Sequence, residues 1–174
     1  MTVAVMQKLE NLRASLEVHI NATLVTVDTI KCKFPRVPFD TGGLASWIEL
    51  NYLNKTTRKI FGRVTSSVGG IDTDRLFQVF CFARIAEATN AYVLERVRDK
   101  VLGRLSNGTE ISVKDYAGGS PSAVIDTAQV YYESENEIPE TVALGGQAAV
   151  RIGENLAGLV ITYSLRYIEP HAST

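Results

Sequence analysis

The stretch RLFQVFCFAR, residues 75–84, decides the fold that we expect for this chain of 174 residues. It is typical of a β-strand, in which successive side chains point to opposite faces of a sheet. One face of this strand carries Phe77, Val79, Cys81 and Ala83. The opposite face carries Leu76, Gln78, Phe80 and Phe82. Neither face suits water, so we expect helices to cover one side of the sheet. The other side needs a second layer, made of other strands or of a neighbouring copy of the protein.

Two amphipathic helices are predicted, one before and one after this strand. In residues 3–20, apolar side chains recur every three or four positions, which is typical of a helix with one buried face. The same spacing predicts a second helix over residues 88–105. Its buried stripe consists of Ala91, Leu94, Val97, Val101 and Leu105. We expect this second helix to fold back onto one face of the strand at residues 75–84.

Further strands are predicted from alternating hydrophobicity and from β-branched residues. TLVTVDTIKCKF, residues 23–34, is rich in β-branched residues, and LASWIELNYL, residues 44–53, alternates cleanly. The last element, GLVITYSLRYIE, residues 158–169, alternates over its whole length. Shorter strands are predicted at residues 110–116 and around residues 129–133.

The order of these elements predicts the fold class. Helix, strands, helix and strands follow one another without the regular strand–helix alternation of a parallel sheet. We therefore expect an α+β fold, with a mostly antiparallel β-sheet and two main helices packed on one face. The length fits a single domain over residues 1–174, long enough to bury roughly 70% of its unfolded surface.

One polar segment, residues 54–74, interrupts this pattern, and two interpretations of it stay open. It is either a β-hairpin arm, with strands near residues 59–64, or a long mobile loop. Loops of this length inside a compact domain are often functional. We expect its basic and aromatic side chains to bind a partner: Arg58, Lys59, Phe61 and Arg63.

Composition and motifs favour a binding or structural role over catalysis. The chain has 18 basic and 19 acidic residues, a balance that gives no support for a nucleic-acid-binding protein. Of the two histidines, His19 is expected to cap a helix or lie on the surface, and His171 lies in the tail. Neither has the spacing of a metal ligand, so we predict no catalytic residues, no metal site and no cofactor. Cys32 and Cys81 are expected to be reduced thiols.

Two weaker hypotheses remain beside this one. A ligand pocket between sheet and helices would be lined by Trp47, Tyr92 and Tyr163. An enzyme would use scattered acidic residues, namely Asp72, Asp74 and Glu95. The N-terminus is charged too early for a signal peptide, and no apolar run reaches the roughly 18 residues of a membrane span. We therefore expect a protein made in the cytosol that does not enter a membrane.

The layout of the chain resembles that of the phage tail terminator proteins. The likeness is carried by the helix VMQKLENLRASLE leading into strands, and by RLFQVFCFAR followed by NAYVLERVRDKVLGRL. It is completed by VYYESENEIPE, which leads to the closing strand GLVITYSLRYIE. It is a likeness of order and pattern over most of the chain.

The resemblance implies a structural virion protein that forms a ring, with six subunits expected. Such a ring caps the tail tube and joins it to the head connector. Its expected partners are other copies of itself, the tail-tube protein and the head–tail connector protein, with DNA only passing through the lumen. The expected location is the tail or neck of the virion, and the host cytoplasm during assembly.

A ring needs a heterologous interface, in which one patch meets a different patch on the next copy. We expect Trp47, Phe80, Phe82 and Tyr163 to lie in that interface, because they would otherwise leave an apolar face uncovered. Another head–tail connector or a tail-completion protein is the nearest alternative function.

Overall fold

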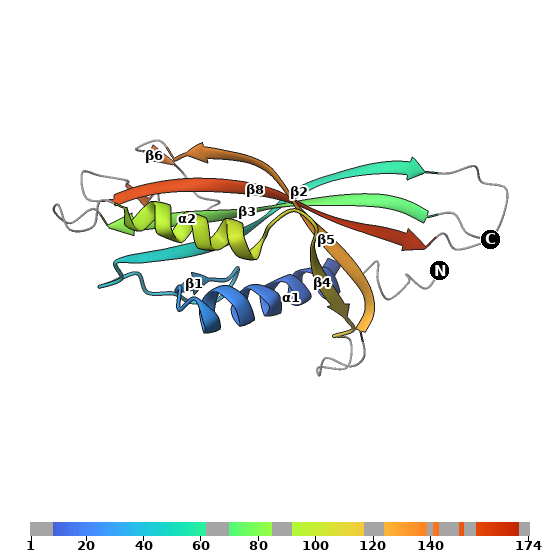
Figure 1. Cartoon of the computed structure of the whole chain (residues 1–174), viewed down its shortest axis with the longest axis horizontal. Helices are drawn as coiled ribbons and strands as arrows, with labels where there is room; N and C mark the ends of the chain where they lie inside the picture. The colour runs from blue at the N-terminus through green and yellow to red at the C-terminus, as the bar shows by residue number, and fades with distance from the viewer. Residues whose placement is uncertain are drawn as a thin grey trace.

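The computed structural model describes residues 9–61, 70–84, 92–116, 124–138, 141–142, 150–151 and 156–170. It describes no side chains in residues 54–74 or beyond residue 167. A six-stranded sheet forms the centre of the molecule (Figure 1). In chain order its strands are β1 (Cys32–Lys33), β2 (Ser46–Phe61), β3 (Gly70–Arg84), β4 (Thr109–Lys114), β5 (Val124–Glu137) and β8 (Leu156–Pro170). Two short strands, β6 (Thr141–Val142) and β7 (Val150–Arg151), pair only with each other.

The strands lie in the order β1-β2-β3-β8-β5-β4. All neighbouring pairs are antiparallel except β1 and β2, which run parallel. The helices α1 (Leu9–Ile20) and α2 (Val93–Arg104) lie on the same face of this sheet (Figure 1). The predicted α+β class, with a mostly antiparallel sheet and two helices on one face, is confirmed.

β3, which contains RLFQVFCFAR, lies at the centre of the sheet. β3 is hydrogen-bonded to β2 on one side and to β8 on the other, so that Val79 lies between Leu50 and Ile161. A strand with two neighbours and two covered faces reads as a continuous apolar run, as this one does. Its helix-facing side packs into a core with both helices. The fully buried side chains of that core include Leu16, Val101, Phe77, Ile161 and Tyr163.

A second, smaller apolar cluster lies on the opposite face of the sheet. It consists of Trp47, Phe80, Phe82 and Ile138, with Phe39, Leu44, Leu156 and Val160 packed at its margin. The rings of Trp47 and Phe82 stack with centroids 5.2 Å apart. Gly158 lies opposite Phe82 in the ladder, and a Cβ at this position would come within 3.1 Å of the phenyl ring. The second layer predicted for this face is thus built from segments of the same chain.

One predicted strand is wrong. Residues 21–27, within a segment rich in β-branched residues, continue α1 as a π-helix, η2 (Asn21–Val27), and only Cys32 and Lys33 are extended into a strand. The Thr23 hydroxyl donates to the carbonyl of His19 (2.8 Å), and the Thr26 hydroxyl donates to that of Asn21 (2.9 Å). These bonds satisfy carbonyls of the wide helical turn, while Leu24 is fully buried in the core. Packing and side-chain hydrogen bonds therefore override the β propensity of the segment.

The outer edge of β4 is closed by α1. The Ser15 hydroxyl accepts a hydrogen bond from the N–H of Lys114 (3.0 Å), and the Asn11 amide oxygen accepts one from the N–H of Tyr116 (3.1 Å). Both polar side chains are buried. The helix thus protects an edge strand that would otherwise present unpaired backbone groups to solvent.

Candidate functional site

The predicted arm at residues 54–74 contains two long strands, as one of the two interpretations required. β2 continues to Phe61, and β3 begins at Gly70 and pairs with it from Thr56 to Phe61, beyond a register shift between Tyr52 and Thr56. β8 adds a third strand, and these three strands project past the ends of the helices (Figure 1). The first strand of the arm begins earlier than predicted. The sequence predicted strands near residues 59–64, whereas β2 already runs through residues 54–58.

The predicted partner-binding residues lie near the end of this arm. Arg58 is paired with Thr73, Lys59 with Asp72, and Phe61 with Gly70. Arg63 lies outside the described residues. Arg58 and Lys59 are thus adjacent on a long strand at the margin of the sheet.

In the described part of the chain, the outer edge of this strand is paired over only a short part of its length. β1 pairs only with Ile48 and Glu49, and the N–H of Ile48 donates to the carbonyl of Lys31 (2.9 Å). The next step of a parallel ladder would require the N–H of residue 35, which is proline and has none. No strand within the described part of the chain pairs with this side of β2 beyond Glu49. An exposed edge of this kind can pair with a strand of another chain.

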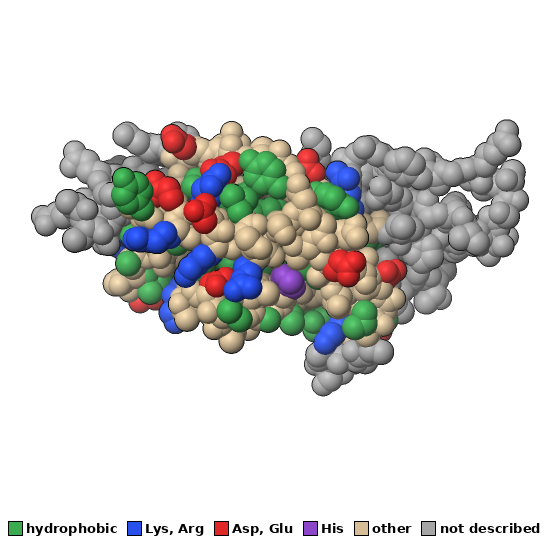
Figure 2. Space-filling model, viewed as in Figure 1, with side chains coloured by type: hydrophobic (Ala, Val, Ile, Leu, Met, Phe, Trp, Pro, Cys, Tyr) green, Lys and Arg blue, Asp and Glu red, His purple; other side chains and the backbone are tan. Residues whose placement is uncertain are grey.

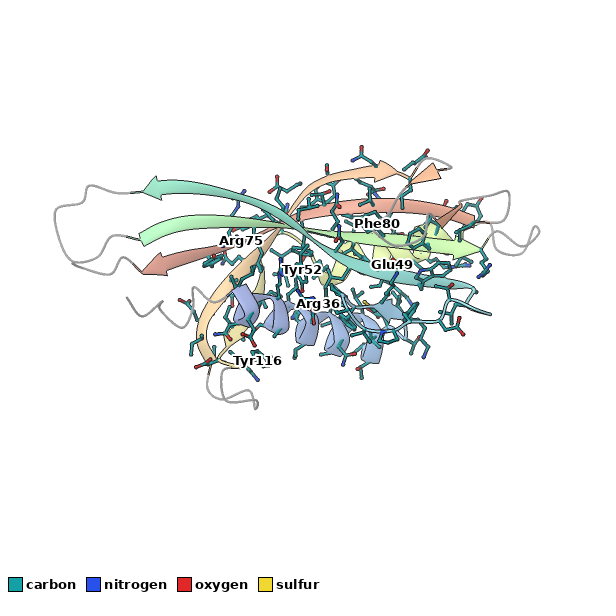
Figure 3. All side chains as sticks on the ribbon, turned by 180° about the vertical axis from the view of Figure 1, so that it is seen from behind. Arg36, Glu49, Tyr52, Arg75, Phe80 and Tyr116 are labelled. Carbon is teal, nitrogen blue, oxygen red and sulfur yellow. The ribbon has the colours of Figure 1, made fainter. Side chains whose placement is uncertain are left out.

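A groove of about 420 Å³ lies beside this edge, between α1 and the turn that follows β1. Its polar lining includes Arg13, Glu17, Arg36 and Tyr52. The hydroxyl of Tyr52 lies 3.0 Å from Oε1 of Glu17 and 3.1 Å from the carbonyl oxygen of Arg13. The Arg13 guanidinium lies over the Tyr52 ring, 4.6 Å from its centroid. Figure 3 shows Tyr52 between the sheet and α1, with Arg36 nearby.

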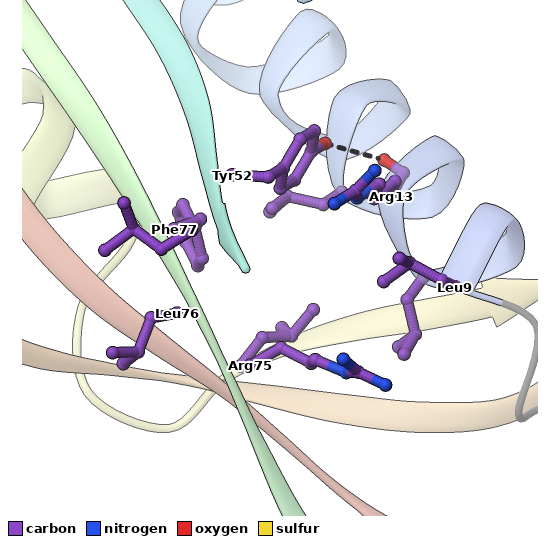
Figure 4. A pocket seen from close by; sticks show the side chains of 10 residues that line it. Leu9, Arg13, Tyr52, Arg75, Leu76 and Phe77 are labelled. Carbon is purple, nitrogen blue, oxygen red and sulfur yellow. Dashed lines mark hydrogen bonds between the residues drawn. The ribbon is translucent and has the colours of Figure 1, made fainter. Parts of the chain in front are cut away.

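The electrostatics of this groove follow from burial. Burial raises the pKa of the Glu17 carboxyl, although the Tyr52 hydrogen bond and the charges of Arg13 and Arg36 act in the opposite direction. Burial also raises the pKa of Tyr52, and the Glu17 charge adds to this effect. Tyr52 is therefore a neutral hydrogen-bond donor that links β2 to α1. A small cavity of about 30 Å³ adjoins it, and Figure 4 shows Leu9, Arg75, Leu76 and Phe77 around that cavity.

Glu49 is an ionisable side chain that the sequence analysis did not single out. Its carboxylate is almost buried and accepts hydrogen bonds from the Trp47 indole N–H and from Lys33 Nζ, both at 3.1 Å. These two hydrogen bonds compensate the charge of Glu49 next to the second apolar cluster. A buried charge needs such partners, because it has lost its contact with water. The alternation of residues 44–53 placed Trp47 and Glu49 on one face, but no signal in the sequence identified Lys33 as their partner.

The four residues predicted for a subunit interface are buried inside a single chain. Trp47 is 2% exposed, Phe80 8%, Phe82 0% and Tyr163 0%. Tyr163 lies on the helix-covered face, where it stacks on Phe77 with centroids 5.3 Å apart. The reason for assigning these side chains to an interface was an apolar face without cover, and that reason does not hold. Contact between copies would therefore require side chains other than these four.

The hypothesis of a pocket lined by Trp47, Tyr92 and Tyr163 is also wrong. Trp47 and Tyr163 lie on opposite faces of the sheet, each inside a separate apolar cluster. Tyr92 precedes α2 and is 70% exposed. The three rings therefore do not converge.

The residues considered for catalysis or metal binding are spread over the molecule. Glu95 is exposed on α2, whereas Asp72 and Asp74 lie in the arm portion of β3. His19 is half-buried, and burial lowers the pKa of its imidazole. His171 lies outside the described residues. Among the side chains that the structure describes, no three His, Cys, Asp or Glu form a group that could hold a metal ion.

Figure 2 shows the helix-covered face of the molecule, where basic and acidic side chains are interspersed. Some of these charges are paired. Arg104 holds Asp28 through two hydrogen bonds (2.8 and 3.1 Å), and Arg98 donates to Glu135 (2.7 Å). These pairs connect α2 to the segment after η2 and to β5. This face therefore offers no single-signed patch of the kind that steers a highly charged partner.

Comparisons with known proteins add little to this geometry. No family model matches the chain, and no curated protein matches it. One solved structure that matches superposes with a TM-score of 0.48 and 12% sequence identity, over 92% of this chain and 97% of the other. Its name states no activity, and a likeness of this degree carries no argument about function. Within the described ranges, no helix is long and apolar enough to cross a bilayer.

Proposed function

We propose that this protein is a structural component of a phage virion, a ring-forming tail terminator that caps the tail tube and joins it to the head connector. The single observation that carries the proposal is the three-stranded arm with an open, basic outer strand. The proposal also rests on the order of helices and strands, by which the sequence resembles the tail terminator proteins.

The arm is suited to contact another protein. β2, β3 and β8 project past both helices (Figure 1), and the outer strand carries Lys55, Arg58 and Lys59 without any acidic residue between Asn51 and Phe61. A long edge strand exposed in a monomer is a liability for aggregation unless a partner covers it. We therefore assign the arm to contacts within an assembly, either with a tube subunit or with another copy of the chain.

The two covered faces of the sheet also restrict how an assembly forms. Since Phe82 and Tyr163 are buried in one chain, copies do not need to meet through an apolar sheet face. Contacts through edges and arms leave each subunit folded before it joins the assembly.

The test uses tail tubes assembled from the tail-tube protein of the same genome. Purified wild-type protein is expected to bind one end of each tube and to stop its elongation, as seen by negative-stain electron microscopy and by tube length distributions. Tubes that bind no protein at their ends and keep growing would contradict the proposal. Binding to an isolated head connector, but not to tubes, would instead favour the connector or tail-completion alternative.

A matched pair of variants separates the arm from general surface charge. Arg58→Glu reverses one charge on the open strand, and Arg96→Glu reverses one exposed charge on α2. Loss of capping is expected for Arg58→Glu and retention for Arg96→Glu, with both variants showing wild-type circular dichroism. Equal capping by both variants would remove the arm from the proposal.

A further inference from the structure

The edge of β5 that faces away from β8 is closed along only part of its length. β4 pairs with β5 between Val124 and Val130, and Asn107 Oδ1 accepts the N–H of Tyr132 (2.7 Å). Beyond that point, no strand in the described ranges pairs with this side of β5. Within the described ranges, the second half of β5 therefore has an open outer edge, like the arm portion of β2.

The backbone groups of two acidic residues in this segment, Glu135 and Glu137, point outward from the sheet. The N–H of Ile138 donates to the carbonyl of Gly158, which lies on the β8 side (3.0 Å). Backbone groups of successive residues point to alternate sides of a strand. The N–H and C=O groups of Glu137 and Glu135 therefore point away from β8, toward the open side.

The two open edges carry opposite charges. The open part of β2, residues 51–61, has three basic residues and no acidic one: Lys55, Arg58 and Lys59. The open part of β5, residues 133–137, has three acidic residues and no basic one: Glu133, Glu135 and Glu137. Glu137 is exposed, and Glu135 is bound by Arg98 (2.7 Å). Glu133 is exposed as well, but its carboxylate accepts a hydrogen bond from the Ser164 hydroxyl and lies 3.7 Å from the Arg166 guanidinium, so Glu137 is the acidic side chain of this segment with the least compensation within the chain.

The positions of these edges decide what can join them. The arm end of β2 and the second half of β5 lie toward opposite ends of the long axis of the molecule (Figure 1). One chain therefore does not bring its own two open edges together. Two different patches at opposite ends give a head-to-tail contact between copies, which closes into a ring when the rotation allows.

We infer that the open edge of β2 in one copy pairs with the open edge of β5 in the next copy, so that the sheet continues across the interface. This inference rests on the proposed function and specifies the partner of the basic strand. Backbone hydrogen bonds supply the attraction in strand addition, and charge complementarity selects the partner edge. Pairing of β2 with β2, or of β5 with β5, brings two sets of like charges together and is disfavoured.

Two variants test the inference directly. Arg58→Glu with Lys59→Glu turns the charge of the open β2 segment from +3 to −1. Glu133→Lys with Glu137→Lys turns that of the open β5 segment from −3 to +1 and leaves Glu135 with Arg98. Because it also removes the contacts of Glu133 with Ser164 and Arg166, Glu133→Lys alone is measured beside it to separate the loss of these contacts from the reversal of charge. Sign-preserving controls are Arg58→Lys with Lys59→Arg, and Glu133→Asp with Glu137→Asp. Thermal unfolding of each variant verifies that it is folded before its mass is measured.

Analytical ultracentrifugation distinguishes the outcomes. Wild type and both controls are expected to assemble, and each charge-reversed variant alone to stay monomeric. An equimolar mixture of the two charge-reversed variants is expected to assemble again, because alternating copies restore both contacts. In wild type, raising the salt concentration is expected to weaken assembly by about tenfold or more, since exposed charges are screened.

Three results would overturn the inference: a monomeric wild type, charge-reversed variants that assemble like wild type, or folded variants whose mixture does not assemble. The capping experiment on tail tubes is read out separately with wild-type protein. If tubes are capped although charge reversal leaves the ring intact, only the edge pairing is wrong. If wild type neither assembles nor caps tubes, the proposed function is wrong as well.

Discussion

The side-chain oxygen of Asn11 on α1 accepts a hydrogen bond from the backbone N–H of Tyr116, just beyond the end of β4, at 3.1 Å. One helical turn further along, Ser15 accepts the N–H of Lys114. α1 therefore packs on the sheet and also closes one of its edges. The outer edge of β4 is thus closed. In the described part of the chain, the outer side of β2 and the second half of β5 have no comparable cover.

The first prediction concerns this closure. Asn11→Ala removes the acceptor of the part-buried N–H of Tyr116 and is expected to lower the free energy of unfolding by about 1–3 kcal/mol. Urea denaturation measures the loss, with Val18→Ala as the control because Val18 is 51% exposed on the same helix. The control is expected to change stability by less than about 0.5 kcal/mol. Equal stability of the Asn11 variant and wild type would show that the hydrogen bond does not support the fold.

The second prediction separates core from interface on the outer face of the sheet. Phe82 is fully buried against Trp47 within one chain. Phe82→Ala is expected to destabilise the isolated monomer by about 3–5 kcal/mol, because it removes a buried ring and leaves a cavity. Urea denaturation at a protein concentration too low for assembly gives the value. A variant that unfolds like wild type but fails to assemble would instead place Phe82 in a subunit interface.

The third prediction concerns pH. Burial raises the pKa of Glu17 above its ordinary value of 4.5 in the folded protein. The folded state then binds a proton more tightly than the unfolded state, so the contribution of Glu17 is fully present below 4.5 and is lost as pH rises through the folded pKa. Glu17→Gln keeps an oxygen acceptor for Tyr52 but does not titrate.

The measurement for Glu17 is the urea midpoint of both proteins from acidic to neutral pH. The stability difference between Glu17→Gln and wild type is expected to shift in favour of the variant as pH rises. His19 contributes pH dependence of the opposite sign, because its pKa is lowered, but this contribution is common to both proteins and cancels in the difference. A difference that stays constant over the whole range would contradict the raised pKa of Glu17.

The fourth prediction concerns the two cysteines. Both are free, and burial raises the pKa of each thiol to about 12. Since the thiolate is the reactive form, neither cysteine is expected to react with a chromogenic disulfide reagent in the native protein at neutral pH. Both are expected to react within the mixing time in denaturant. Rapid labelling of the native protein would show that one of the thiols is accessible and ionised.

The two central strands of the sheet were predictable because burial on both of their faces makes their sequences apolar over a long stretch. β3 and β8 appear where RLFQVFCFAR and GLVITYSLRYIE placed them, and the helical spacing of Val97, Val101 and Leu105 predicted the buried face of α2. The strand predicted over residues 23–34 failed because propensity alone supported it. The π-helix there depends on contacts of Leu24 and on threonine hydroxyls, which no periodicity reveals.

The candidate site was only partly accessible from the sequence. The basic arm was recognisable from its composition, and its strands now show which edge is open. The open edge of β5 was not predicted, because it depends on where β4 stops pairing. The interface assignment of Phe80 and Phe82 failed because Phe39, Leu44 and Ile138 come from distant segments to cover them. Sequence alternation shows that a face is apolar, but not which part of the chain covers it.

The central claim is that this protein works by assembling with copies of itself through heterologous contacts, and native mass spectrometry of the wild-type chain tests it most directly. The account predicts a single closed species, expected at six subunits, that coexists with monomer and is favoured at higher concentration. A strict monomer at every concentration would contradict the account. A compact dimer that is insensitive to salt would contradict it as well.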